Sequence, residues 1–233
     1  MEKVKLDKTK VHQKYLLADG REVVGVTTAL GVMNKPALLA WAWKLGTQNI
    51  DYRKVKGMAA DAGTVAHFMC ECFLKKQEPD LSDYSANDIS KAENAYIKFV
   101  TWWDNNGFEL VASEAQLVSG KYGYGGTLDI VAKDTDGILH LCDIKTSKAV
   151  YDEYFYQCAA YRELWNENNP CYNHITGATY IVRIGKEADP DDFETPSRIN
   201  LDDEFQVFLN CLALHKSLQV VKNKNKTERI GKK

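Results

Sequence analysis

The chain has 233 residues, of which 45% are hydrophobic and 27% are charged, and its formal net charge is −2. This composition is typical of a soluble globular protein, and the charge gives no general signal for nucleic acid. No run approaches the roughly 18 apolar residues of a membrane span, and the N-terminal MEKVKLDKTK lacks the apolar segment of a secretory signal. We therefore expect a cytoplasmic protein without a membrane partner.

The six cysteines are scattered and form no C-x-x-C pair, so we expect free thiols in a reducing compartment. They are Cys70, Cys72, Cys142, Cys158, Cys171 and Cys211. The first two lie on a predicted helix, where a spacing of two residues turns their side chains about 200° apart. The pattern therefore does not favour a zinc or iron–sulfur site.

Taken in chain order, the sequence YLLADGREVVGVTTAL, residues 15–30, has the pattern of two strands around an Asp19-Gly20 turn. Apolar periodicity and end signals then predict three helices, over residues 36–46, 57–76 and 87–106. Three strands joined by Gly-containing turns follow, over residues 108–119, 122–134 and 137–147. The remaining elements are a helix, a strand and a last helix, over residues 152–166, 177–185 and 202–221. This order predicts an α/β or α+β fold, in which helices flank a mixed central sheet and elaborate its N-terminal side.

The sequence LHLCDIKTSK, residues 139–148, puts Asp143 and Lys145 on the same face of a predicted strand as Leu139 and Leu141. Residues two apart on a strand are separated by about 7 Å along the backbone. A charge on a core-facing surface is costly unless it is paired or holds a metal. The pattern therefore indicates either a structural ion pair or a reaction centre, and the strand geometry alone leaves both open.

Asp129 is a lone acid in the apolar strand YGYGGTLDIVAK, and Gly125 and Gly126 before it indicate the close approach of another group. If the short turn KDTDG joins neighbouring antiparallel strands, Asp129 lies near Asp143. Adjacent carboxylates raise each other's pKa, and a divalent cation removes that penalty. Such oxygen ligands select Mg²⁺ or Mn²⁺, and Lys145 beside them would orient a water or stabilise the charge of a phosphodiester transition state.

Two more residues have open alternatives. Glu114 in LVASEAQLV is by itself typical of an exposed strand residue, and it becomes a candidate only if the two aspartates lie near it. His67 lies opposite the apolar stripe of its helix, on a face of small residues. It is either solvent-facing or a ligand of a metal or a phosphate.

Gln157 and Tyr161 are one helical turn apart in FYQCAAYREL, directly after DIKTSK. A tyrosine at this spacing is usually a core residue, whereas the amide of a glutamine on the same stripe needs hydrogen-bond partners. We expect both side chains to face the cleft that contains Lys145.

The motifs GTVAH, SEAQL, GYGGTLD, DIKTSK and QCAAY occur here in the order and rough spacing of the RecB-like branch of the PD-(D/E)XK nuclease superfamily, which this chain resembles. The resemblance spans residues 63–161. The segment VTTAL to KPALLAWAWKLG also resembles the N-terminal segment of phage and mitochondrial exonucleases of this branch. Each motif is weak alone, but five in order are specific.

The resemblance implies a restriction-endonuclease-like core and metal-dependent hydrolysis of DNA, most consistent with an exonuclease of phage-type DNA recombination, replication or repair. It implies one or two Mg²⁺ or Mn²⁺ ions, held by His67, Asp129, Asp143 and the carbonyl of Ile144. The catalytic residues would be Lys145, Asp129, Asp143, Glu114 and Gln157. Gln157 and Tyr161 would contact the DNA backbone. Some members bind an iron–sulfur cluster through cysteines near the C-terminus, and since no cysteine follows Cys211, we expect no cluster.

We further expect Lys121, Lys148 and Arg162 to lie near the site and to follow a DNA backbone, either single-stranded or at a duplex end. Phage or host recombination proteins would be further partners. The chain is interpreted as one nuclease domain over 1–233, divided into an N-terminal hairpin with helices, a catalytic core, and a C-terminal helix with a basic tail, over 1–107, 108–185 and 186–233.

Three other functions stay open at this point. The chain could be a non-catalytic nucleic-acid-binding module that keeps the fold, or a structure-specific endonuclease. It could also be a small-molecule enzyme or interaction protein whose charged strand ends are structural pairs. A requirement for Mg²⁺ or Mn²⁺ in DNA cleavage distinguishes the nucleases from the others.

Overall fold

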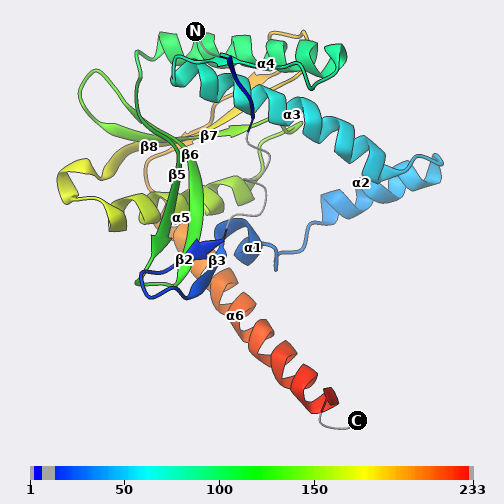
Figure 1. Cartoon of the computed structure of the whole chain (residues 1–233), viewed down its shortest axis with the longest axis vertical. Helices are drawn as coiled ribbons and strands as arrows, with labels where there is room; N and C mark the ends of the chain where they lie inside the picture. Colours follow the sequence, from blue (N-terminus) through cyan, green and yellow to red (C-terminus); the bar gives the residue numbers. More distant parts are fainter. Residues whose placement is uncertain (1–2, 7–13, 231–233) are drawn as a thin grey trace.

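Figure 1 shows the computed structural model of the chain, which describes residues 3–6 and 14–230. At residues 37, 56, 58–60 and 226–230 it describes the backbone and not the side chains. The last residues of the predicted basic tail, 231–233, lie outside the described part.

The helices begin where the sequence supplies end signals. Pro36 starts one helix, and the Asp51 carboxylate accepts a hydrogen bond from the N–H of Arg53 at 2.9 Å at the start of the next. The helices are α1 (Val26–Leu30), α2 (Pro36–Thr47), α3 (Tyr52–Leu74), α4 (Ala86–Asn105), α5 (Asp152–Asn168) and α6 (Asp202–Ile230), with a short 3-10 turn η2 (Cys171–Asn173).

Four long strands form the centre of the main sheet, and short strands extend it. The long ones are β5 (Glu109–Ser119), β6 (Tyr124–Lys133), β7 (Leu139–Lys145) and β8 (Ile175–Ile184). The short strands of this sheet are β2 (Tyr15–Leu16), β3 (Glu22–Gly25), β9 (Phe193–Glu194) and β10 (Ser197–Arg198). A separate parallel pair joins β1 (Lys3–Val4) to β4 (Glu78–Pro79).

The main sheet is mixed, in the order β10-β8-β7-β6-β3-β2, with β5 also pairing with β6 and β9 with β8. β5, β6 and β7 form the predicted antiparallel meander. β8 runs parallel to β7, which requires the crossover that α5 provides. β3 runs parallel to β6.

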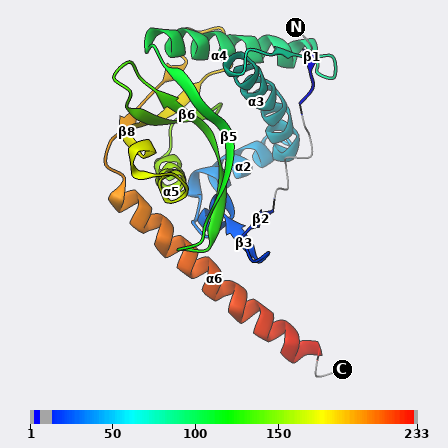
Figure 2. The same cartoon turned by 60° about the vertical axis from the view of Figure 1, so that its left-hand side comes forward.

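Helices cover both faces of this sheet (Figures 1 and 2). One hydrophobic cluster joins the sheet to α1, α5 and the first half of α6, through residues such as Phe155, Leu164 and Phe208. The other joins the opposite face to α3 and α4, through Val65, Phe99 and Trp103 among others. The prediction of a mixed central sheet flanked by helices is therefore confirmed.

Two parts of the chain project from this body. α2 and the start of α3 extend to one side, and the second half of α6 extends downward in Figure 1. None of the helices within the described ranges has the length and apolar character to cross a membrane.

One element differs from its prediction. The second strand of the first hairpin ends at Gly25, and residues 26–30 form α1 instead of continuing it. Val26, Ala29 and Leu30 share a helical face at spacings of three and four residues, and all three are buried in the cluster beneath α6. Burial of this face outweighs the β preference of Val26-Thr27-Thr28.

Candidate active site

Strands β6 and β7 separate next to Asp129, one of the candidate residues of the sequence analysis. β6 pairs with β5 along one edge, while its other edge is shared by β7, which pairs with residues 130–133, and β3, which pairs with residues 124 and 125. Within the described sheet, residues 126–129 therefore have no strand partner on that edge. Asp129 is the last of these residues, at the point where β6 leaves β7.

Asp143 lies fully buried on β7, and its Oδ2 atom forms an ion pair with the ammonium group of Lys145. Its Oδ1 atom has no hydrogen-bond partner among the described residues. Burial raises the pKa of Asp143 to about 6; Lys145 opposes this rise and Asp129 adds to it. A buried carboxylate with a bare oxygen is costly for a fold to keep, so this residue points to a group that binds there.

Lys145 is held from two sides. Its ammonium group contacts Asp143 and lies 5.1 Å from the ring centroid of Tyr154 on α5. Burial alone would lower the pKa of Lys145, but Asp143 and Asp129 together raise it above the usual value. The ammonium group therefore stays charged, with 18% of its side chain exposed at the end of the strand.

Asp129 bridges the gap between β6 and β7. Its Oδ2 atom accepts a hydrogen bond from the backbone N–H of Ile144 at 2.9 Å. The pairing of Ile130 with Cys142 brings Asp129 opposite Asp143 in the antiparallel register. Burial raises the pKa of Asp129, Lys145 and His67 lower it, and Glu114 raises it further. The antiparallel register therefore brings the two carboxylates next to each other, and, in addition to burial, the charge of Asp129 raises the pKa of Asp143.

His67 lies on α3 between two backbone carbonyls. Its Nδ1 atom is 2.9 Å from the oxygen of Gly63, and its Nε2 atom is 2.9 Å from the oxygen of Ile144. A neutral imidazole has one N–H, so it can donate to only one of the two oxygens. The other contact needs either a second proton on the ring or a cation beside the nitrogen and the carbonyl.

Gly63 explains how α3 comes so close to the end of β7. A Cβ atom at this position would lie 2.5 Å from the Oγ1 atom of Thr146, which directly follows the strand. The absence of a side chain lets the helix approach the strand end, so that His67, one turn later, reaches Ile144. The motifs GTVAH and DIKTSK are therefore in direct contact, through Gly63 with Thr146 and His67 with Ile144.

Glu114 and Glu71 line a small pocket together with His67, Asp129 and Ile144. Glu114 has a left-handed backbone with φ of 52°, and it lies between the pairs Ser113–Ile130 and Ala115–Leu128, opposite Asp129. A non-glycine residue in this conformation stores strain, a feature that clusters at functional sites. The structure therefore brings Glu114 to the candidate site, opposite Asp129, which meets the condition under which the sequence makes it a candidate.

Glu71 is the residue of this pocket that the sequence analysis missed. It lies one helical turn after His67 on α3 and also forms an ion pair with Lys75. The spacing of four residues between His67 and Glu71 puts both side chains on the same helical face, and this spacing was the available signal.

Gln157 and Tyr161 lie on α5 and are bonded to each other, the Gln157 amide donating to the Tyr161 hydroxyl at 2.8 Å. The Tyr161 ring is buried at 5% exposure and packs where a Cβ on Gly126 would lie, 2.6 Å from its Cε1 atom. Burial raises the pKa of Tyr161, and the charges of Asp143 and Asp129 raise it further. The Tyr161 hydroxyl thus holds the amide of Gln157, and in this structure the Tyr161 ring is not presented to solvent.

The three basic residues that were predicted to contact a DNA backbone do not all lie close to one another. Lys148 is exposed in the loop directly after β7. Lys121 lies in the β5–β6 turn, where its N–H bonds Glu167, and five residues of strand, about 17 Å, separate Tyr124 at that turn from Asp129. Arg162 donates to the Ile199 carbonyl and pairs with Asp202. The separation of Lys121 from Asp129 along β6 corrects the expectation that Lys121 lies near the site, whereas Lys148 closely follows Lys145 in the chain.

The donor set of this site fits a hard divalent cation. Within residues 3–6 and 14–230, no three His, Cys, Asp or Glu side chains converge closely enough to hold a metal as they lie. The backbone oxygen of Ile144, 2.9 Å from the Nε2 atom of His67, would be a further donor to a cation. Adjacent ligands of an octahedral ion with bonds of about 2.1 Å lie about 3 Å apart. With a cation there, the Nδ1–H of His67 donates to Gly63, a common arrangement for a metal-bound histidine.

No family model matches the sequence, and no curated protein matches it. Among solved structures, the crystal structure of LHK-Exo in complex with dAMP is similar with a TM-score of 0.45 and 12% identity, over 75% of this chain and 91% of that chain. The crystal structure of SSO0001 is similar with a TM-score of 0.32 and 19% identity, over 60% of this chain and 68% of that one. The function proposed below therefore rests on the geometry of the site.

Proposed function

We propose that the chain is a metal-dependent deoxyribonuclease of the RecB-like PD-(D/E)XK type, with a restriction-endonuclease-like core and one nuclease domain over residues 1–233. The single observation that carries this proposal is the relation between His67 and Ile144, whose ring nitrogen and carbonyl oxygen lie 2.9 Å apart near the buried carboxylate of Asp143 and the half-buried carboxylate of Asp129. A cation resolves the unmatched histidine contact and occupies the bare oxygen of Asp143.

The proposed metal ligands are Asp129, Asp143, the Ile144 carbonyl and His67, and the cation is Mg²⁺ or Mn²⁺ because most of these donors are hard oxygens. When bound, the cation lowers the pKa of a water and neutralises charge on the phosphate. The chain's own contribution is Lys145, whose ammonium group is positioned by Asp143 to orient the water that attacks phosphorus. Gln157, held by Tyr161, and Glu114 complete the polar surroundings.

The finer statements of this proposal rest on the sequence motifs. The motif order supports an exonuclease acting in phage-type DNA recombination, replication or repair, with DNA ends as substrate and recombination proteins as partners. Lys148, exposed beside the strand end, is the cation placed to contact the backbone of bound DNA.

Digestion of end-labelled DNA tests the proposal. Linear and circular DNA, single- and double-stranded, would be incubated with Mg²⁺, Mn²⁺ or EDTA. We expect degradation of linear DNA that requires the metal, and a loss of at least about 100-fold for Lys145→Ala, because an electrostatic group at the reacting phosphate is removed. Lys133→Ala is the matched control, since this lysine pairs with Glu109 at the other end of β6.

Each other outcome has a distinct meaning. Cleavage of circular DNA identifies an endonuclease, and DNA binding without cleavage identifies a non-catalytic module. Degradation that persists in EDTA, or at full rate in Lys145→Ala, contradicts the proposed mechanism.

A further inference from the structure

Helix α2 packs very little of its surface against the rest of the protein. None of its described side chains is buried, and Leu39 and Trp43, one turn apart, are 72% and 73% exposed. An edge-to-face contact between Trp41 and Tyr52, with centroids 6.3 Å apart, holds it against the start of α3. We call residues 36–54 the arm; it is the part of the chain that extends to the right in Figure 1.

An exposed surface of this kind points to a binding partner. A twelve-residue helix is marginal in water unless its apolar face is covered, and large exposed apolar patches mark interaction sites. The two buried tryptophans of α4, Trp102 and Trp103, show that this fold can cover such side chains where the core needs them. Trp43 is instead held at the surface.

The charges of the arm favour nucleic acid as the occupant. Lys44, Arg53 and Lys54 are exposed. The guanidinium of Arg53 lies 5.9 Å from the ring centroid of Tyr52, and Tyr52 and the charge of Asp51 help to raise the pKa of Arg53. The arm contains one acidic residue, Asp51, which caps α3 by accepting a hydrogen bond from the backbone N–H of Arg53. Aromatic side chains interspersed with cations bind single strands, because bases stack on the rings while phosphates meet the cations. Two copies of the arm face to face would instead bring like charges together.

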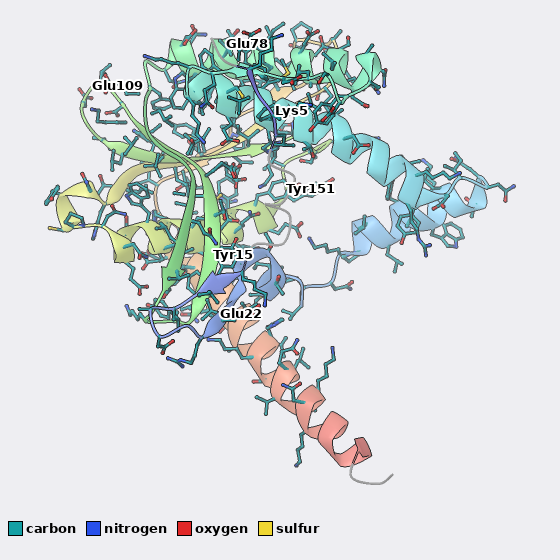
Figure 3. The ribbon with its side chains drawn as sticks, in the orientation of Figure 1. Lys5, Tyr15, Glu22, Glu78, Glu109 and Tyr151 are labelled. Atoms are coloured by element: carbon teal, nitrogen blue, oxygen red, sulfur yellow. The ribbon has the colours of Figure 1, made fainter. Side chains whose placement is uncertain are left out.

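The arm is continuous with the candidate active site. Tyr52 begins α3 and His67 lies fifteen residues later on the same helix, so the two positions are about 22 Å apart along the axis. A strand that rises about 3.4 Å per nucleotide covers this distance with about six nucleotides. Figure 3 shows α3 running from the arm toward the sheet.

We propose that the arm binds the single-stranded part of a DNA substrate by stacking a base on Trp43 and holding phosphates at Lys44 and Lys54, with the start of α3 about six nucleotides from the scissile phosphate. The register in this statement rests on the proposed nuclease function. The binding surface itself rests on the exposed residues of the arm. It predicts a length dependence that a site confined to the sheet edge would lack.

The test measures binding of labelled oligothymidylates of 4 and 20 nucleotides to the full chain in EDTA, by fluorescence anisotropy. We expect Trp43→Ala to weaken binding of the 20-mer at least fivefold and to leave the 4-mer unchanged, because only the longer strand reaches the arm. Trp43→Phe should retain most of the affinity. Tyr172→Ala, which removes an aromatic side chain 83% exposed at η2, is the matched control.

The outcomes separate this inference from the nuclease proposal. If Trp43→Ala weakens binding of the 20-mer but the wild-type chain cleaves no DNA, the proposed binding surface is supported and the proposed nuclease function is overturned. A chain that cleaves DNA with Mg²⁺, and whose Trp43→Ala variant binds the 20-mer as tightly as wild type, overturns the proposed role of the arm. Light scattering that shows a dimer lost in Trp43→Ala, with DNA binding unchanged, assigns the surface to a second copy and also overturns it.

Discussion

The Nε2 atom of His67 lies 2.9 Å from the carbonyl oxygen of Ile144, although 77 residues separate them in the chain. The contact joins α3, on one side of the sheet, to the end of strand β7, at the point where β7 separates from β6. Its two partners are both electron-rich unless the ring nitrogen carries a proton. The properties of the site that can be tested follow from how this contact is satisfied.

A first prediction concerns stabilisation by metal. Mn²⁺ or Mg²⁺ at 100 times its dissociation constant should raise the free energy of unfolding by about 2.7 kcal/mol, through preferential binding to the folded chain. In His67→Ala the gain should shrink, because a ligand is lost. Thermal unfolding with and without EDTA measures it. His174→Ala, which removes a ring bonded to the Asn169 carbonyl, is the control and should keep the full gain.

A second prediction concerns pH and Asp143 in the metal-free chain. Its folded-state pKa, about 6, exceeds the value of about 3.9 in an unfolded chain, so the folded state holds the proton more tightly between these values. The contribution of Asp143 to stability is therefore present below pH 4 and is lost as pH rises toward 6, by on the order of 3 kcal/mol.

Asp143→Asn removes this titration. The unfolding free energy of the variant minus that of wild type should therefore rise between pH 4 and pH 7, in urea titrations with EDTA. A difference that stays flat or falls with pH would show that burial does not dominate the pKa of Asp143.

A third prediction concerns the left-handed backbone of Glu114. Glu114→Gly removes the side chain and accommodates φ of 52° without strain, so it should stabilise the chain by about 1 kcal/mol while lowering nuclease activity. Glu114→Gln should lower activity without the gain in stability. Denaturant unfolding paired with DNA digestion measures both. A glycine variant with full activity would leave Glu114 as a purely structural residue.

A fourth prediction concerns the packing of Tyr161 on Gly126. Gly126→Ala places a Cβ atom 2.6 Å from the ring, so the ring must shift, at a cost of about 1 to 3 kcal/mol. Because Tyr161 holds Gln157, activity should fall as well. Gly120→Ala is the comparison, since the nearest atom to its Cβ, Oε1 of Glu167, is 3.8 Å away. Equal stability of the two variants would argue against tight packing at Gly126.

A fifth prediction concerns Glu71, which shares a pocket with His67 and Glu114. Glu71→Gln should lower nuclease activity on the order of 10- to 100-fold, as expected for an acid that lies beside metal ligands. Lys75→Ala breaks the ion pair of Glu71 but keeps its carboxylate, and should leave activity near wild type. If both variants lose activity equally, the ion pair rather than the carboxylate is what matters.

Much of the architecture was predictable because local patterns and tertiary contacts agree. The periodicity of α3 and α4, the antiparallel meander β5 to β7 and the crossover through α5 were all visible in residue order. Alternation in β7 correctly indicated that Asp143 faces the core. In contrast, residues 26–30 form a helix because three of them pack beneath α6, and no local signal reports that packing.

The site was predictable where a motif fixes its residues and was not where distance along the chain was taken for distance in space. Asp129, Asp143 and His67 approach each other because strand register and Gly63 determine their positions. Lys121 follows a glycine-containing turn at the far end of a long strand, and Arg162 on α5 is held by Ile199 and Asp202. Both positions depend on strand length and helix rotation, which the motif does not specify.

The most direct measurement is a crystal of the full chain soaked in Mn²⁺, with anomalous scattering recorded at the manganese edge. The account predicts a peak in contact with His67 Nε2, the Ile144 carbonyl oxygen, Asp129 and Asp143, with the ammonium group of Lys145 next to it. A crystal that takes up manganese elsewhere and shows His67 still bonded directly to Ile144 would contradict the proposed metal centre, and with it the proposed mechanism.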